Sequence, residues 1–402
     1  MVGSIGKTAS RHLPAVIQSM FIIALGNFID SSYAPLAPFI KNYYILTATQ
    51  VGLITSILFI GSSSVAVFTG FLVDRIGHHN AMKLSFGIMA IGSTVLFGSR
   101  DYATLLAGFY FIGFGYGMLT PATNSQIMEE YYPEHLTRMG VKQAGVPMGA
   151  ALAAIMLPPV VIKVGIPHVY LLIITMAAIL LIILPLRNPV NKDRFQLGKY
   201  IKEMFETVKD KYLLLIGFSA LFMSWSQQSV MTYYVLYFRN IKFGTLIAES
   251  FLYSVLISAI FGRILWTRLG NRLFGQNHIK TFSLIMVFAA AVIILLPRFS
   301  SDIFTAYIFS IFVGITAISW NGVFVSMTSE IAPTGKVGMY SGMGILLISS
   351  GTILGTPISG MIIDHFHSYN LMWMIMGVTV MVVGIVLFII SNKMKITSKR
   401  ST

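Results

Sequence analysis

Four ionisable residues lie within apolar stretches of the sequence, where a charged side chain is costly. Asp30 and Glu249 are the acids so placed, and Lys142 and Arg263 are the bases. A charge at the centre of a lipid bilayer costs about 2.5 to 3.5 kcal/mol on insertion scales, so function is expected to depend on such residues. A carboxyl group there can take up and release a proton, and a guanidinium group can hold a carboxylate through paired hydrogen bonds.

Arg263 has the sharpest candidate chemistry. It precedes Asn271 by eight residues, which is about 12 Å along a helix axis and too far for its side chain to reach the membrane surface easily. A planar, permanently charged guanidinium suits a substrate carboxylate. A role as a gate, or as a structural partner for a helix end, is the alternative.

Asp30 is the candidate for proton coupling. It lies in the segment Asn27-Phe-Ile-Asp30-Ser-Ser-Tyr33, well inside an apolar run, and is expected to take and release a proton as a cavity opens to either side. A packing role, with hydrogen bonds to Ser31, Ser32 or a neighbouring span, is the alternative. Glu249 is expected one turn inside the end of its helix, at a solvated rim.

Amide and aromatic side chains in mid-helix are the other candidates for ligand contact. The substrate-binding candidates, besides Arg263, are Gln227, Gln228, Tyr233, Trp320, Asn321, Lys142 and Gln143. Amides and indoles can bond a polar ligand at a lower cost than charges, whereas aromatic stripes alone are more often packing. A discontinuity in the helix that carries Gln227 is a usual place for a ligand site. Lys142 begins its helix, where its ammonium can still reach the membrane surface.

The composition places these residues in membrane-spanning helices. The chain of 402 residues is 55% hydrophobic and 10% charged, with a mean hydropathy of +0.78. Twelve apolar runs are each long enough to cross a bilayer. They lie near residues 13–40, 48–73, 80–99, 103–130, 140–163, 167–186, 212–238, 245–268, 279–297, 302–329, 338–364 and 369–391. The prediction is an all-α integral membrane protein.

The net charge of +14 is explained by orientation in the membrane. With the N-terminus in the cytoplasm, 22 of the 28 Lys and Arg residues lie on the cytoplasmic side. This asymmetry follows the positive-inside rule, so both termini are predicted to be cytoplasmic, with the protein in the plasma membrane and no nucleic-acid partner. The first run is too long for a removed signal peptide, and the absence of cysteine excludes disulfides and thiol chemistry.

The chain consists of two similar halves. Glu130 and Pro133 recur as Glu330 and Pro333, 200 positions later. Parallel repeats of six spans build one group of secondary transporters, with the substrate site between the halves. The predicted domains are an N-terminal six-helix bundle (1–186), a cytoplasmic linker with an amphipathic helix lying on anionic lipid (187–211), and a C-terminal six-helix bundle (212–402).

One loop motif carries a family resemblance. It consists of Gly70, Asp74, Arg75 and Gly77, which match the G-x-x-x-D-R-x-G loop between the second and third spans of the major facilitator superfamily. The chain resembles this family over its whole length. The resemblance implies the major facilitator fold, and a contact between Asp74 and a base such as Arg138 that breaks on switching. A tight basic turn is the alternative. The second half carries a degraded copy of the loop that includes Asn271 and Arg272, which are therefore also gating candidates.

The span that carries Arg263 also resembles one transporter subfamily. Its Arg263-x-x-x-Thr267-x-x-x-Asn271 spacing is similar to a motif of monocarboxylate transporters, where the Arg engages the substrate carboxylate. Two other family motifs are altered here. Phe109 stands where the family usually has an Arg. One residue is inserted into the glycine-proline motif of drug antiporters at Gly145-Val-Pro147, and this insertion argues against export as the function.

The predicted function is secondary transport of a small organic anion, a carboxylate or sugar acid, by proton symport with alternating access. Proton-coupled efflux of drugs or amphipathic cations is the alternative, and a non-transporting receptor is a third. The expected partners are the substrate, protons and membrane lipid, with the protein a monomer. The sequence has no metal-spaced His/Asp cluster, no nucleophile-base set and no nucleotide-binding glycine loop, so we expect no enzyme activity, metal or cofactor.

Overall fold

The computed structural model describes residues 15–131, 135–186, 198, 206–207, 209–275, 277–333 and 337–393. All regular elements in these ranges are helices, and twelve helical segments are long and apolar enough to cross a membrane. The predicted all-α class and the twelve spans are therefore confirmed for a multi-pass membrane protein. Most of the 187–211 linker, with its predicted amphipathic helix, lies outside the described residues.

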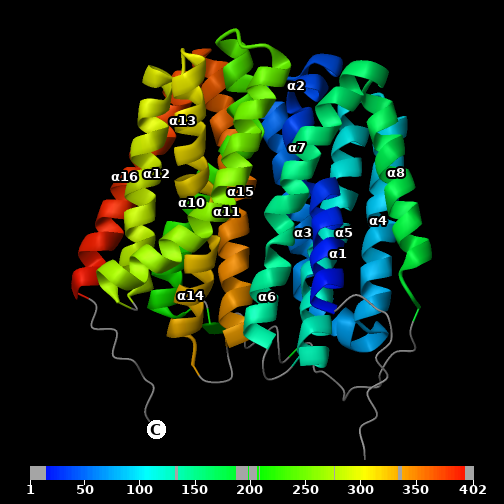
Figure 1. Cartoon of the computed structure of the whole chain (residues 1–402), viewed down its shortest axis with the longest axis horizontal. Coiled ribbons are helices and arrows are strands. Elements are labelled where there is room, and N and C mark those ends of the chain that lie inside the picture. Colours follow the sequence, from blue (N-terminus) through cyan, green and yellow to red (C-terminus); the bar gives the residue numbers. More distant parts are fainter. Residues whose placement is uncertain are drawn as a thin grey trace, which may run out of the picture.

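The helices run side by side across the molecule (Figure 1). Those of the first half are α1 (Ala15–Asp30), α2 (Tyr33–Tyr43), α3 (Ala48–Ile76), α4 (His78–Gly98), α5 (Tyr102–Tyr131), α6 (His135–Gln143), α7 (Gly145–Val164) and α8 (Ile166–Ile183). Those of the second half are α10 (Lys211–Asn240), α11 (Thr245–Phe274), α12 (His278–Phe299), α13 (Ile303–Val313), the π-helical turn η1 (Gly314–Ile318), α14 (Asn321–Ile331), α15 (Val337–Phe366) and α16 (Tyr369–Lys393). We call the face where α1 begins and α16 ends the terminal face, and the opposite one, where α2 and α15 end, the far face.

Small residues let the helices within each half approach closely. A Cβ atom at Gly149 of α7 would lie 2.0 Å from the carbonyl oxygen of Ala24 in α1. A Cβ atom at Gly351 of α15 would lie 2.1 Å from the carbonyl oxygen of Leu221 in α10. Lipid gives no hydrophobic drive for helices to associate, so close backbone contact has to supply the attraction. These small residues therefore serve packing.

The two halves are joined at the far face by a carboxylate that caps a helix of the other half. Asp364, near the end of α15, accepts hydrogen bonds from the backbone N–H groups of Ala48 and Thr49, both at 2.8 Å. It also accepts one from the Thr49 hydroxyl at 2.6 Å. Free N–H groups and the helix dipole at the start of α3 favour a negative charge there. The contact therefore holds α3 of the first half to α15 of the second.

Close backbone packing extends this contact into the membrane. A Cβ atom at Gly360 would lie 2.5 Å from the Cα atom of Thr49, and one at Gly52 would lie 2.5 Å from the carbonyl oxygen of Thr356. The Tyr233 hydroxyl of α10 lies 2.9 Å and 2.8 Å from the carbonyl oxygens of Ala48 and Thr356, as a donor shared between them. The far face is thus closed by α3, α10 and α15.

The Asp364 cap gives the first prediction. Replacing Asp364 with Asn removes the charge and one acceptor oxygen, which should weaken far-face closure by about 1 kcal/mol, a roughly fivefold change in the ratio of closed to open protein. The chain has no cysteine, so Ser56→Cys, at a position that bonds Ile353 across the interface, supplies a single reporter for a maleimide added from the far side. Its labelling rate should rise severalfold in Asp364→Asn.

Asp302→Asn is the matched control, because Asp302 caps α13 within one half. This variant should lose stability without faster labelling at position 56. Equal labelling in wild type and Asp364→Asn would show that the cap does not hold the far face closed.

Candidate functional site

Asp30 lies at a break in the first span. It is the last residue of α1, and Ser31 and Ser32 separate it from α2. Its side chain is buried, and its Oδ1 atom has no hydrogen-bond partner among the residues that the structure describes. Ser31 donates instead to the Asn27 amide oxygen at 3.1 Å, and the Ser32 hydroxyl is also without a partner in the described ranges. The packing hydrogen bonds considered from the sequence are therefore not formed.

A tyrosine of the fourth span connects Asp30 with Arg263. The Tyr116 hydroxyl of α5 accepts a hydrogen bond from the Asn27 side-chain amide at 2.9 Å. It lies within electrostatic reach of both the Asp30 carboxyl group and the half-buried Arg263 guanidinium of α11. An acid of the first half and a base of the second half thus share one polar region, which we call the central site.

A second break lies in the tenth span. The π-helical turn η1 interrupts it, and Trp320 and Asn321 follow at the start of α14. The Asn321 side-chain amide donates to the Gln227 side-chain oxygen of α10 at 3.1 Å. Trp320 is buried against Phe282 and Phe324, so its indole ring mainly packs. The structure thus joins two of the predicted ligand amides at an irregular segment, the kind of backbone that lines transporter sites.

The predicted discontinuity in the seventh span is wrong. Helix α10 runs unbroken from Lys211 to Asn240, and among the described residues breaks lie in the first span, in the fifth between α6 and α7, and in the tenth. The π turn remains stable within the membrane because the Trp266 indole donates to the Ile315 carbonyl oxygen at 2.6 Å. Sequence reasoning missed this turn, since no proline marks it. The signal was Gly314, where a Cβ atom would lie 2.1 Å from the carbonyl oxygen of Val255.

The remaining predicted contacts of α10 point toward the far face. The Gln228 side-chain oxygen accepts from the Tyr33 hydroxyl of the first half at 2.9 Å. Tyr233 is fully buried with its hydroxyl engaged by Ala48 and Thr356. In this conformation both residues join the halves.

Lys142 does not reach the membrane surface, which corrects the prediction from its position in the sequence. Its side chain is fully buried, and the ammonium donates to Thr123 Oγ1 at 3.2 Å and Asn124 Oδ1 at 2.6 Å. The reason is that the side chain projects from α6 toward polar groups of α5, and both of these partners are neutral. The adjacent Gln143 is exposed.

The prediction for Glu249 is also wrong. The sequence predicts a solvated rim position, but the side chain is 0% exposed. The first turns of α11 pack against α10 and α13, through rings such as Phe251 against Phe238 and Tyr307. The sequence gives the position of a residue along its helix, but it does not show which neighbouring helices bury that residue.

The predicted gating loop lies at the terminal face. Gly77, with a φ of +81°, links α3 and α4 in a backbone conformation that favours glycine, and Arg75 beside it is exposed. The Arg138 guanidinium lies 4.5 Å from the centre of the Tyr131 ring. Gly70 and the side chain of Asp74 are outside the described part, so the contact between Asp74 and Arg138 stays a prediction. Asn271 and Arg272 are exposed at the end of α11.

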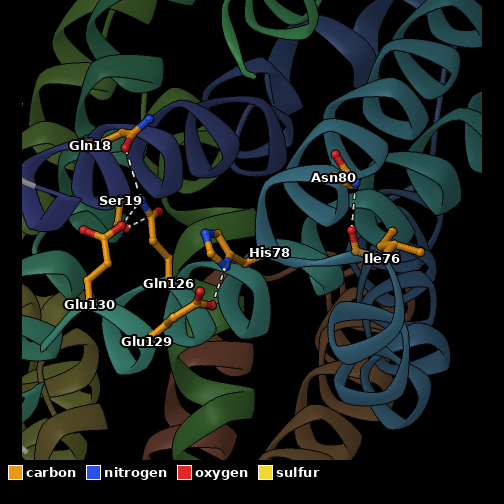
Figure 2. A network of polar contacts seen from close by, with 8 residues as sticks. All are labelled: Gln18, Ser19, Ile76, His78, Asn80, Gln126, Glu129 and Glu130. Atoms are coloured by element: carbon orange, nitrogen blue, oxygen red, sulfur yellow. Dashed lines mark hydrogen bonds and ion pairs between the residues drawn. The ribbon is translucent and has the colours of Figure 1, made fainter. Parts of the chain in front are cut away.

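A histidine and a glutamate pair in each half at this face. Figure 2 shows His78 of α4 beside Glu129 of α5, with His78 Nδ1 3.3 Å from a Glu129 carboxylate oxygen. The same pairing joins His278 of α12 to Glu330 of α14. The histidines are 200 positions apart, as are Glu130 and Glu330, so the repeat extends to this contact although the glutamate of the first half is Glu129. Sequence reasoning missed the pair, and the shared spacing was the available signal.

A further network in Figure 2 ties α5 to α1 near the same face. The Gln126 side-chain oxygen accepts from the Ser19 hydroxyl at 2.8 Å, and its amide donates to Gln18 at 3.1 Å and to Glu130 at 3.4 Å. These bonds hold the lower part of the first span against the fourth, which carries Tyr116. They therefore help to position Asn27 and Asp30.

Twelve spans in two halves, with a polar site at their interface, are the arrangement of a membrane transporter. Residues 19–356 match the sequence model of the Major Facilitator Superfamily, and the chain belongs to this family. The resemblance stated from the sequence is confirmed.

Three known proteins illustrate the similarity. A hexuronate transporter of Bacillus subtilis is 27% identical over 36% of this chain and 35% of its own length, so the match spans about a third of that relative. The fosmidomycin resistance protein of Escherichia coli is 21% identical over 85% of this chain and 84% of its own. The solved structure of the nucleoside transporter NupG covers 95% of this chain and 100% of its own, with a TM-score of 0.76 at 15% identity.

Proposed function

We propose that this protein is a secondary transporter that moves a small organic anion, a carboxylate or sugar acid, together with protons. The observation that carries the proposal is the central site, where Arg263 and Asp30 act on the same tyrosine from opposite halves. Arg263 supplies the fixed cation for the substrate carboxylate, and the carboxyl group of Asp30 is the group that can bind a proton. Similarity to a hexuronate transporter supports an anionic substrate.

The two charges also suggest how substrate and proton are coupled. An ionised Asp30 in the central site would repel a substrate carboxylate bound there. Protonation of Asp30 removes this repulsion, so the anion binds best when the proton is bound. Substrate and proton then cross the membrane together in the same direction, which is symport.

The proposed cycle starts from the conformation described here. We place the terminal face in the cytoplasm, because most Lys and Arg residues are predicted there, and the protein in the plasma membrane as a monomer. With the far face closed by Asp364 and α3, this is then the inward-facing state. Opening the far face and closing the terminal face, where the predicted gating residues lie, completes the cycle.

A substrate panel tests the proposed class. Proteoliposomes should accumulate radiolabelled glucuronate or benzoate when the lumen is made more alkaline than the medium, and should not accumulate tetraphenylphosphonium. Similarity to a fosmidomycin resistance protein makes drug export the second candidate function. Cells that express the protein would then extrude cationic dyes and tolerate higher concentrations of them. Transport of the cation alone would refute the anion proposal.

Arg263 gives a prediction for substrate affinity. Loss of a charge-assisted, bidentate contact should cost about 2 to 4 kcal/mol, so Arg263→Gln should bind the best panel anion roughly a hundredfold or more weaker. Arg263→Lys keeps the charge without the planar fork and should retain weak binding. Equilibrium binding to purified protein measures both.

The control for Arg263 is Arg268→Gln, which removes an exposed guanidinium from the same helix and should bind normally. Normal affinity in Arg263→Gln together with slower transport would assign Arg263 to gating instead.

Asp30 gives a prediction for coupling. Asp30→Asn removes the titrating group while keeping the side-chain size, so gradient-driven accumulation should be lost. Counterflow exchange between labelled and unlabelled substrate needs no net proton movement and should continue. Asp101→Asn, which alters an exposed cap of α5, is the matched control and should transport normally. Loss of exchange as well, with a lower melting temperature, would indicate that Asp30 is structural.

A further inference from the structure

One hydrogen bond joins the two halves beside Asp30. The Tyr33 hydroxyl of α2 donates to the Gln228 side-chain oxygen of α10 at 2.9 Å. Tyr33 is buried, and its phenol also lies within electrostatic reach of the Asp30 carboxyl group. Asp30 ends α1 and Tyr33 begins α2, so the break in the first span brings the two side chains into one region. The bond between the halves therefore forms next to the group that is proposed to bind the proton.

This bond lies between the central site and the contacts that close the far face. On α10, Gln228 follows Gln227, whose side chain bonds Asn321 at the irregular segment of the tenth span. Five residues further along α10, about 7.5 Å nearer the far face, the Tyr233 hydroxyl bonds carbonyl oxygens of α3 and α15. A change at Gln228 is thus placed to affect the closure above it.

Few titratable groups surround Asp30. Two phenols, Tyr33 and Tyr116, interact with it electrostatically, and Arg263 of α11 interacts with Tyr116. Tyr116 bonds Asn27 of its own half, whereas Tyr33 bonds the second half. The other described charged groups on α2, α5, α6 and α7, which adjoin α1, have other partners or face solvent: Lys41, Glu129, Glu130, Arg138, Lys142 and Lys163.

The charge on Asp30 decides which acceptor the Tyr33 hydroxyl prefers. While Asp30 is protonated, the neutral Gln228 amide competes well, and this is the bond observed. An ionised carboxylate accepts a hydrogen bond about twice as strong, and Asp30 Oδ1 has no partner among the described residues. A bond within the membrane opens at low cost only when its groups find replacements. Ionised Asp30 supplies one for Tyr33, and water in the opening cavity supplies one for the half-buried Gln228.

We propose that Tyr33 links protonation of Asp30 to closure of the far face, bonding Gln228 while Asp30 is protonated and turning to its carboxylate when the proton leaves. Tyr33 is then a positioning residue, and the inference rests on the proposed role of Asp30 in symport. The link gives each half of the cycle its direction. A carrier that has taken up a proton favours the far-closed state, and one that has released the proton favours reopening.

Electron–electron resonance between two spin labels measures far-face closure without any substrate. The chain has no cysteine, so Asn42→Cys in the last turn of α2 and Ser301→Cys before α13 place one exposed label on each half at the far face. In lipid nanodiscs the distance between the labels should be short at acid pH and should lengthen at alkaline pH, as Asp30 ionises. Asp30→Asn should remain closed at both, and a wild-type protein whose distances do not change with pH would overturn the proposal.

Tyr33→Phe distinguishes a link from ordinary packing. Loss of the bond to Gln228 should lower the ratio of closed to open protein roughly fivefold at acid pH and should remove most of the pH response. Adding Gln228→Leu should then have little further effect. The matched control is Ser56→Ala, which removes a bond to the Ile353 carbonyl oxygen across the same interface. It should weaken closure to a similar degree while keeping the pH response. A full pH response in Tyr33→Phe would show that Tyr33 only packs.

Transport separates this proposal from the general one. A full pH response in Tyr33→Phe, together with gradient-driven accumulation of benzoate or glucuronate by wild-type proteoliposomes, refutes the link and leaves symport intact. A pH response that requires both Tyr33 and Asp30, in a protein that transports no carboxylate, supports the link and refutes the proposed function.

Discussion

The contact between Asp364 and the first turn of α3 sets the conformation on which every other feature depends. The free N–H groups of Ala48 and Thr49 need acceptors, and a carboxylate from the opposite half provides them. Because this contact lies at the end of two spans, water can replace the protein partner when the halves separate. The same bonds at mid-membrane would leave groups with no replacement and could not open at low cost. Position at the surface therefore makes the closure both stable and reversible.

Closure at the far face explains the role of the helix breaks in the first and tenth spans. The break after Asp30 ends α1, and the π turn before Asn321 ends α13, so each half places a polar group where its span is irregular. Irregular backbone within a membrane needs local partners, which Trp266 supplies in the second half. A ligand site built this way changes its access when the halves rock, without any change inside either half.

Hydropathy in the sequence sufficed to predict the twelve spans, and it showed which acids and bases lie within them. Each of these depends on composition along the chain, which the sequence contains directly. The burial of Glu249, the direction of Lys142 and the position of Tyr233 between the halves could not be predicted. These depend on the rotation of a helix and on which neighbour covers it. The π turn could not be predicted either, because it accompanies the close approach of α11 at Gly314 and is not marked by a helix-breaking residue.

In the proposed cycle the charges of the central site also explain how the empty transporter returns. With substrate bound, the carboxylate balances Arg263 and Asp30 is neutral. After release, the proposal has Asp30 give up its proton, so the empty central site holds one acid and one base on the return step. Lys142 differs, since its partners Thr123 and Asn124 carry no charge in either condition. No described acid balances its ammonium, which agrees with the proposed anionic substrate.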